Sequence, residues 1–474
     1  MSVPNTKRKF SLGPAILVTA AFIGPGTVFS ASRSGANYGF VLLWAVGFSV
    51  IATIILQEMA ARLGIVTGDG LTQAIKSSMR NPLAKLAVLG LVLIAVLFGN
   101  AAYQTGNILG AAKGVSVLFD SQPATNGTLK TDSDQLATAT TSTSQSATNQ
   151  PSLPDTTTRT LSTQDFVVLA IGLIALTVIW VGRFDILQSL LTLLVALMSV
   201  LFVMAAIQCK PDWGQVAIGF VPRIPKGSQL FVIALIGTTV VPYNLFLHAS
   251  AAKQRWDFSG MENDAESQAL KKNAISYSRW DTIASVLIGG IVTAAILITA
   301  SVAFHSIESA ETAGTTLAKT TAGAHQVALQ LEPALGSWAK TMFAIGLCAA
   351  GLTSAITAPI AAGYAASGCF GWPEKLSDWR LKSVASVVVL IGVMMGILLP
   401  NSPIETIILA QVANGLLLPI VAVLLLVMAN RSDIMGEFRN RWLTNILGVV
   451  VIGITILIAF KNFNWAWGKI QAML

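Results

Sequence analysis

The chain has 474 residues, of which 54% are hydrophobic and only 11% are charged, and its mean hydropathy is +0.69. Ordinary soluble domains carry about 25% charged residues, so this composition excludes a soluble enzyme, a nucleic-acid-binding protein and a disordered chain. It is typical of a polytopic membrane protein. The net charge of +8 therefore bears on membrane orientation before it bears on partners.

Eleven segments contain the roughly 20 mostly apolar residues that a membrane-spanning helix needs. They are 12–32, 39–63, 86–118, 164–181, 186–207, 229–251, 279–304, 337–366, 382–400, 403–429 and 442–460. Most Lys and Arg residues fall on one side if the N-terminus lies in the cytoplasm. We therefore expect an integral protein of the plasma (inner) membrane, with a cytoplasmic N-terminus and an outer C-terminus.

Three connections have distinct compositions. Residues 119–163 are almost all small and polar, which predicts a flexible outer loop. Residues 305–336 form a second expected outer loop with a short helix at about 324–331, and 253–278 an amphipathic cytoplasmic connection. Three cysteines without metal-binding spacing and three histidines predict no metal cluster and no cofactor.

Two spans carry a helix breaker near mid-membrane. The first reads Gly24-Pro25-Gly26-Thr27-Val28-Phe29 and the sixth Val241-Pro242-Tyr243-Asn244-Leu245-Phe246. The same spacing separates the two prolines and the two phenylalanines, and span six runs opposite to span one. Matching interruptions in two halves are typical of an inverted repeat with a substrate site between the halves. A plain proline kink at each position is the simpler alternative. We expect unwound backbone around 24–27 and 240–244.

Several motifs resemble the Nramp family of metal-ion transporters, in the right order over nearly the whole chain. They are the segment from Gln57 to Gly68, the segment from Val240 to His248, the segment from Gly351 to Thr357, and the group Gln411-Val412, Leu418-Pro419 and Ile434-Met435-Gly436. The resemblance implies an all-α, 5+5 inverted-repeat bundle of the amino-acid/polyamine/organocation type with one extra helix. The chain would form a single domain over 1–474, with repeat one at about 12–207, repeat two at about 229–429 and the extra helix at about 442–460.

The departures from the family concern the metal site. The first-helix motif D-P-G-N is Gly24-Pro25-Gly26-Thr27 here, so the metal-binding carboxylate is absent. The soft methionine ligand of the sixth helix is Val241, and the histidine after the proline is Tyr243. The third-helix stretch 98–104, where the family carries acidic residues used in proton transfer, has none. His248, Gln411 and Asp281 match family positions.

The remaining candidate ligands are neutral oxygens. The predicted substrate-binding residues are Gly24, Thr27, Thr238, Val241, Tyr243, Asn244 and Gln411, of which Thr27, Asn244 and Gln411 would be the metal ligands, if any. Such a set suits a hard or hydrated ion better than a soft transition metal. A pocket without a carboxylate at helix N-termini also no longer repels an anion, so a neutral or anionic small solute remains an alternative.

Three charged or titratable features have both functional and structural interpretations. His248 is a candidate proton relay, or a packed, hydrogen-bonded histidine. Asp281 is a candidate gate or ion-pair residue beside Arg279, and Glu58 and Arg62 are spaced for a helical ion pair. Gln411 is alternatively a polar contact between helices.

The sequence thus favours a secondary transporter that works by alternating access, with a transported ion or solute and the lipid bilayer as partners and no nucleic acid. A monomer is compatible with it. A sensor that kept the fold and lost transport is the second hypothesis. A membrane enzyme is the third, and no nucleophile–base pair, phosphate loop or metal cluster supports it.

Overall fold

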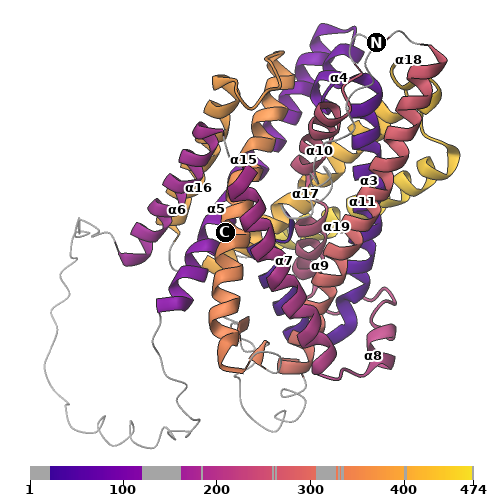
Figure 1. The fold of residues 1–474 in the computed structure, drawn as a ribbon. Coiled ribbons are helices and arrows are strands. Elements are labelled where there is room, and N and C mark those ends of the chain that lie inside the picture. The colour runs from indigo at the N-terminus through magenta and orange to yellow at the C-terminus, as the bar shows by residue number, and fades with distance from the viewer. Residues whose placement is uncertain are drawn as a thin grey trace, which may run out of the picture.

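The computed structural model describes residues 22–119, 162–182, 185–258, 261, 264–305, 327–328, 331–332, 336–399 and 403–471. The regular elements in this part of the chain are helical, as expected (Figure 1). They are α2 (Pro25–Tyr38), η1 (Gly39–Leu42), α3 (Leu43–Thr67), α4 (Leu71–Ser78), α5 (Pro82–Phe119), α6 (Thr163–Val181), α7 (Asp185–Gln208), α8 (Trp213–Ile218), α9 (Gln229–Thr239), α10 (Pro242–Arg255), α11 (Ala265–Ala300), η2 (Ser301–His305), η3 (Gly336–Trp338), α15 (Ala339–Phe370), α16 (Trp379–Leu398), α17 (Pro403–Asn430), α18 (Ser432–Met435), η4 (Gly436–Phe438) and α19 (Trp442–Gln471).

Nine helical segments within the described residues are long and apolar enough to cross a membrane, against eleven predicted spans. One segment, Pro25–Thr67, holds residues 25–32 of the first predicted span and all of the second, because the short η1 turn joins α2 to α3 without a polar loop. The predicted span at 186–207 lies on α7, and the described stretch Val195–Gln208 of this helix is apolar. Residues 12–21 of the first predicted span lie outside the described residues.

The predicted amphipathic connection at 253–278 belongs largely to the two flanking helices, and its cytoplasmic location stays a prediction. α10 continues to Arg255, and α11 already begins at Ala265, capped by the Asp264 side chain on the Ser267 N–H. No proline or other helix breaker separates the polar first turns of α11 from its apolar part, so one helix of 36 residues contains both. The predicted outer loops fall almost wholly outside the described residues, although Val327 and Ala328 of the predicted short helix are helical.

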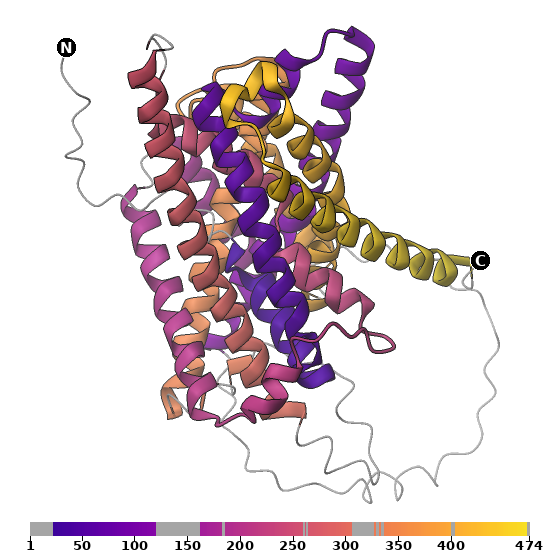
Figure 2. The same cartoon turned by 90° about the vertical axis from the view of Figure 1, so that its right-hand side faces the viewer.

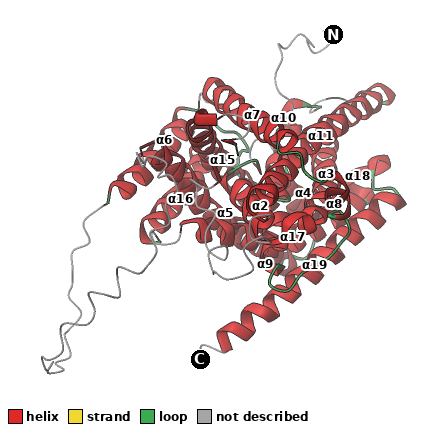
Figure 3. Cartoon of the chain, turned by 90° about the horizontal axis from the view of Figure 1, so that it is seen from below, coloured by secondary structure: helices red, strands yellow, loops and turns green. Residues whose placement is uncertain are grey.

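The broken helix pair α9–α10 lies at the centre of the bundle. In the most apolar window of Gln229–Arg255, 89% of the residues are buried, and in that of Gly336–Phe370, which contains α15, 83%. The corresponding windows of α5, α6 and α19 are only 28–33% buried. Seen from below, α6 and α16 lie on one side of the bundle and α19 on another (Figure 3). Figure 2 shows α19 crossing the bundle obliquely.

The bundle has two distinguishable ends. In Figure 1, α4 and α18 lie at the top, which we call the α4 end, and α8 lies at the bottom, which we call the α8 end. The ion pairs Arg62–Glu58, Lys253–Glu374, Arg279–Glu58 and Arg431–Asp433 all belong to the α4 end.

Glycines allow the central helices to touch backbone to backbone. A methyl group at Gly351 of α15 would lie 2.6 Å from the backbone nitrogen of Ala111 in α5. At Gly64 of α3 it would lie 2.1 Å from the carbonyl oxygen of Ala249 in α10. Such small-residue contacts are how helices associate in lipid, where burial of apolar surface supplies no preference for a neighbouring helix.

We predict that Gly351→Ala destabilises the protein by about 1–3 kcal/mol, because the added methyl group overpacks a contact with backbone atoms that cannot turn away. Gly90→Ala in α5 is the control, since nothing lies within 4 Å of its methyl position, and alanine is the better helix former. Thermal unfolding in detergent measures both. Equal melting temperatures for the two variants would contradict this packing.

Candidate functional site

Both predicted helix breaks are present, each just before its proline. Residues 23–24 are non-helical and α2 begins at Pro25, whereas residues 240–241 are non-helical and α10 begins at Pro242. The breaks are therefore shorter than the predicted 24–27 and 240–244. Proline is well suited to the first position of a helix, where no N–H partner exists anyway. Thr27, Tyr243 and Asn244 consequently lie in the first turns of helices.

The break at Pro242 frees one carbonyl in particular. In a continuous helix the N–H of residue 242 would bond to the carbonyl of Thr238, four residues earlier, but proline has no N–H. The first turns of α2 and α10 also carry N–H groups without helical partners, and they place the positive ends of two helix dipoles at the breaks. The centre of the bundle thus presents a free carbonyl and two electropositive helix starts.

Two hydroxyl groups join the halves across the breaks. The Oγ1 atoms of Thr27 and Thr238 lie 2.8 Å apart, and both residues are fully buried. The Thr27 hydroxyl donates in turn to the carbonyl of Phe22, just before the first break. The structure therefore brings together these two predicted site residues, which are far apart in the sequence.

Gln411 of α17 covers the first break. Its side chain packs on Gly26, where a methyl group would lie 2.3 Å from Nε2, and its amide nitrogen donates to the Ile407 carbonyl at 3.2 Å. Its Oε1 atom is buried and has no hydrogen-bond partner among the described residues. The Oδ1 atom of Asn244 is likewise buried without a partner in that part of the chain. Two amide oxygens at the breaks are therefore unused acceptors.

Gly24 and Val241 contribute no ligand atom. A methyl group at Gly24 would lie 2.9 Å from Ser354 Oγ and 3.6 Å from the Tyr103 hydroxyl oxygen, so a larger side chain first meets α15 and α5. Val241 is 1% exposed. Tyr243 packs against Tyr103 with ring centroids 5.3 Å apart. The predicted residues thus lie at the two breaks, and the ligand atoms that they offer are neutral.

Sequence reasoning missed a stripe of amides on α5. Asn100, Gln104 and Asn107 are buried, with spacings of four and three that place them on one helix face. Gln104 donates at 2.9 Å to the carbonyl of Ala355, which Pro359 four residues later leaves without its helical partner. Asn414, three residues after Gln411 on α17, is also fully buried. The helical spacing of these amides was the available signal.

His248 forms one hydrogen bond, between Nδ1 and Gln57 Oε1 at 2.7 Å, which ties α10 to α3. Its Nε2 atom has no partner among the described residues. This geometry fits the packed, hydrogen-bonded interpretation, and the proton relay stays a prediction.

The predicted ion pair between Glu58 and Arg62 is confirmed, at 3.1 Å. Arg279 also pairs with Glu58, at 2.9 Å, and so joins α11 to α3. Asp281, half-buried on α11, remains a predicted gate or ion-pair residue.

A second ionic contact holds α10 at the α4 end. Lys253 Nζ lies 3.3 Å from Glu374 Oε2, and the Ser250 hydroxyl donates to the same oxygen at 3.4 Å. Glu374 lies between α15 and α16, and its burial raises the pKa of this carboxyl, a shift that Lys253 opposes. Burial also raises the pKa of the Asp69 carboxyl between α3 and α4. The loop between α15 and α16 therefore binds the final turns of α10.

No group of three or more His, Cys, Asp or Glu side chains is placed to hold a metal ion within the part of the chain that the structure describes. All three cysteines, which fall in that part, are free. A metal ion at the helix breaks would therefore depend on neutral oxygen atoms.

The Nramp profile, described as natural resistance-associated macrophage protein-like, matches residues 15–144 and 160–463. The chain belongs to the Nramp family. It is thus a member of a family of integral membrane transporters and not an enzyme. It is 28% identical to "Divalent metal cation transporter MntH 1" of Pseudomonas aeruginosa over 93% of this chain and 88% of the relative. It is 26% identical to "Divalent metal cation transporter MntH" of Staphylococcus saprophyticus, over 96% and 93%.

Solved structures share the fold. A manganese transporter of Eremococcus coleocola, crystallised as a histidine-to-alanine mutant, aligns with a TM-score of 0.67 at 21% identity and covers 98% of this chain and 88% of that one. MhsT in complex with L-phenylalanine aligns with a TM-score of 0.53 at 13% identity, covering 94% and 98%. At these identities the likeness establishes the polytopic all-α fold alone.

Proposed function

We propose that this protein is a secondary transporter of divalent cations that works by alternating access. The observation that carries the proposal is the pair of helix breaks at the centre of the bundle, each placed directly before a proline. Membership of the Nramp family and the names of its curated relatives support a divalent metal ion as substrate. We further propose eleven spans arranged as a 5+5 inverted repeat with one extra helix, and the ionic α4 end as the cytoplasmic end.

The donor set supports a preference for a hard or hydrated ion such as Mg²⁺ over Mn²⁺ or Fe²⁺. The Thr27 hydroxyl, the Thr238 carbonyl and the unused amide oxygens of Asn244 and Gln411 are hard, neutral ligands. No thioether is present at Val241 to favour a softer metal over Mg²⁺. Because Gly24 has no carboxylate, nothing at that position offsets the large free-energy cost of removing water from an ion. Mg²⁺ keeps several waters when bound, and those waters can donate to the two unused oxygens.

The two unused amide oxygens also bear on the alternative substrates, a neutral or an anionic small solute. Buried acceptors without partners repel an anion and accept from a donor. A neutral solute that donates hydrogen bonds is therefore the second candidate substrate, ahead of an anionic one. A sensor without transport would bind the same ligands and show no flux.

We predict that the parent protein binds Mn²⁺ weakly and that Gly24→Asp/Val241→Met/Ser354→Ala gains Mn²⁺ binding by at least tenfold. The first two changes add a carboxylate and a thioether, and the third removes the hydroxyl that lies 2.9 Å from the new Cβ position. Isothermal titration of purified protein with Mn²⁺ and Mg²⁺ measures the effect. The same titrations with small neutral and anionic solutes test the alternatives.

The matched control is Val241→Met/Ser354→Ala, which makes the same two packing changes and lacks the carboxylate. It should bind Mn²⁺ less tightly than the triple variant. Tight Mn²⁺ binding by the unmodified protein between α2 and α10 would contradict the proposed selectivity, because neutral ligands would then suffice.

We also predict that proton cotransport is weak or absent. Proton transfer needs titratable groups along a path. The buried polar side chains of α5 are Asn100, Tyr103, Gln104, Thr105 and Asn107, which include no carboxylate and no histidine. Proteoliposomes with an enclosed pH dye should acidify little when substrate is added. The acidification that a proton ionophore produces in the same vesicles is the reference. Strong acidification that survives His248→Gln would show that another group carries the proton.

A further inference from the structure

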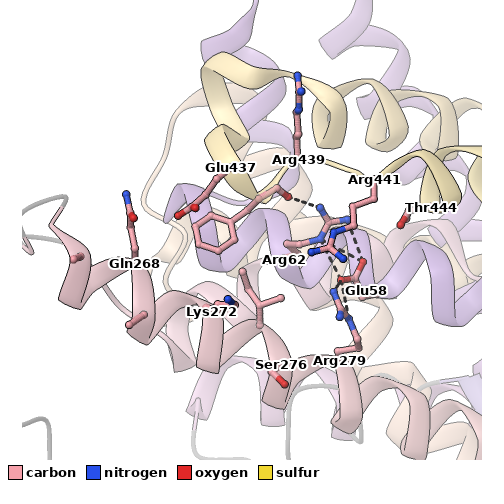
Figure 4. A pocket seen from close by; sticks show the side chains of 14 residues that line it. Glu58, Arg62, Gln268, Lys272, Ser276, Arg279, Glu437, Arg439, Arg441 and Thr444 are labelled. Carbon is pink, nitrogen blue, oxygen red and sulfur yellow. Dashed lines mark hydrogen bonds and ion pairs between the residues drawn. The ribbon is translucent and has the colours of Figure 1, made fainter.

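A second candidate site lies far from the helix breaks, at the α4 end. It is a cavity of about 730 Å³ that opens between α3, α11, η4 and the start of α19 (Figure 4). Its lining is strongly polar. The charged members of the lining are Glu58, Arg62, Lys272, Arg279, Glu437, Arg439 and Arg441. Five cations against two carboxylates give the cavity a positive potential.

Part of this charge builds a rigid wall. Arg62 is held by Glu58 at 3.1 Å, by the Phe438 carbonyl at 2.5 Å and by Asn440 Oδ1 at 2.5 Å. Arg279 reaches the same Glu58 carboxylate from α11. Figure 4 shows the Arg62 and Arg279 side chains meeting at Glu58. One carboxylate thus fixes two guanidinium groups, and their remaining positive charge faces the cavity.

The other three cations are uncommitted. The side chains of Lys272, Arg439 and Arg441 have no hydrogen-bond or ion-pair partner among the described residues, and all three are exposed. They come from both walls, Lys272 from α11 and the two arginines from the segment before α19. Thr444, in the first turn of α19, adds a hydroxyl at a helix N-terminus, which also favours an anion.

Aromatic side chains place the cavity at the level of lipid headgroups. Trp280 and Trp442 neighbour the lining residues Arg279 and Arg441 and are 68% and 73% exposed, and Tyr277 of α11 is 52% exposed. Exposed Trp and Tyr side chains are typical of the membrane–water interface. Basic pockets between helices at that level are suited to lipid phosphates.

We propose that this cavity binds the phosphate group of an anionic phospholipid. The bound phosphate is held between Lys272 of α11 and Arg441 at the start of α19, with Arg62 and Arg279 as the positive floor. It bridges α11 and the start of α19, both of which already contact α3. The site does not depend on the transported substrate, and its occupation stabilises the α4 end of the bundle.

The test uses the full-length protein in a neutral detergent. Dioleoyl-phosphatidylglycerol, dioleoyl-phosphatidylcholine or sodium phosphate is added, and native mass spectrometry measures bound lipid while thermal unfolding measures stability. Lys272→Gln/Arg441→Gln removes one uncommitted cation from each wall. Lys375→Gln/Arg380→Gln is the control, because it removes the same charge from an exposed stretch at the same end, outside the cavity.

The parent and the control should bind phosphatidylglycerol and melt at a higher temperature with it, and phosphatidylcholine should have no such effect. The cavity variant should bind phosphatidylglycerol about thirtyfold more weakly, since each basic residue near an anionic lipid contributes on the order of 1 kcal/mol and about 1.4 kcal/mol is a factor of ten. Equal binding by all three proteins would overturn the site. If sodium phosphate alone gives the same stabilisation with the same dependence on the two cations, the phosphate site stands and its assignment to lipid is overturned.

Discussion

The organisation of this protein depends on two prolines that interrupt helices at the centre of the bundle. Pro25 and Pro242 remove backbone donors inside the bundle, where freed polar groups need protein or a watery cavity as partners. Neighbouring residues pack and form hydrogen bonds around both interruptions. The most deeply buried span holds the second break, Gly26 leaves room for the Gln411 amide, and the paired Thr27 and Thr238 hydroxyls bridge the breaks.

Charged side chains and neutral polar groups occupy different parts of the bundle. The residues at the breaks are neutral, and polarity there comes from amides, hydroxyls, one freed carbonyl and helix starts. The ion pairs of Glu58 and Glu374 lie instead at the α4 end, where each carboxylate binds a cation from a neighbouring helix. An interior built from dipoles binds ions more weakly than one with a buried carboxylate, and it suits a substrate that keeps part of its hydration shell.

Much of this arrangement was predictable from sequence. The prolines, the helical class and the Glu58–Arg62 pair follow from local rules of backbone chemistry and helical spacing, and the Nramp resemblance follows from short motifs. The extents of the breaks were overestimated, because a proline begins a new helix as readily as it ends one. The start of α11 was placed too late in the sequence, because a change in composition and not a helix breaker suggested the boundary. The buried amides of α5 and Asn414 were missed because their helical spacing shows that they share a face, and only tertiary contacts show that this face is buried.

We propose that neutral oxygen atoms at the two breaks select a hard, hydrated cation. The most direct test is flux into proteoliposomes, with Mg²⁺ and Mn²⁺ uptake measured separately and in competition on the unmodified protein. We expect Mg²⁺ uptake that equimolar Mn²⁺ inhibits only slightly. Mn²⁺ uptake that excludes Mg²⁺ would contradict it.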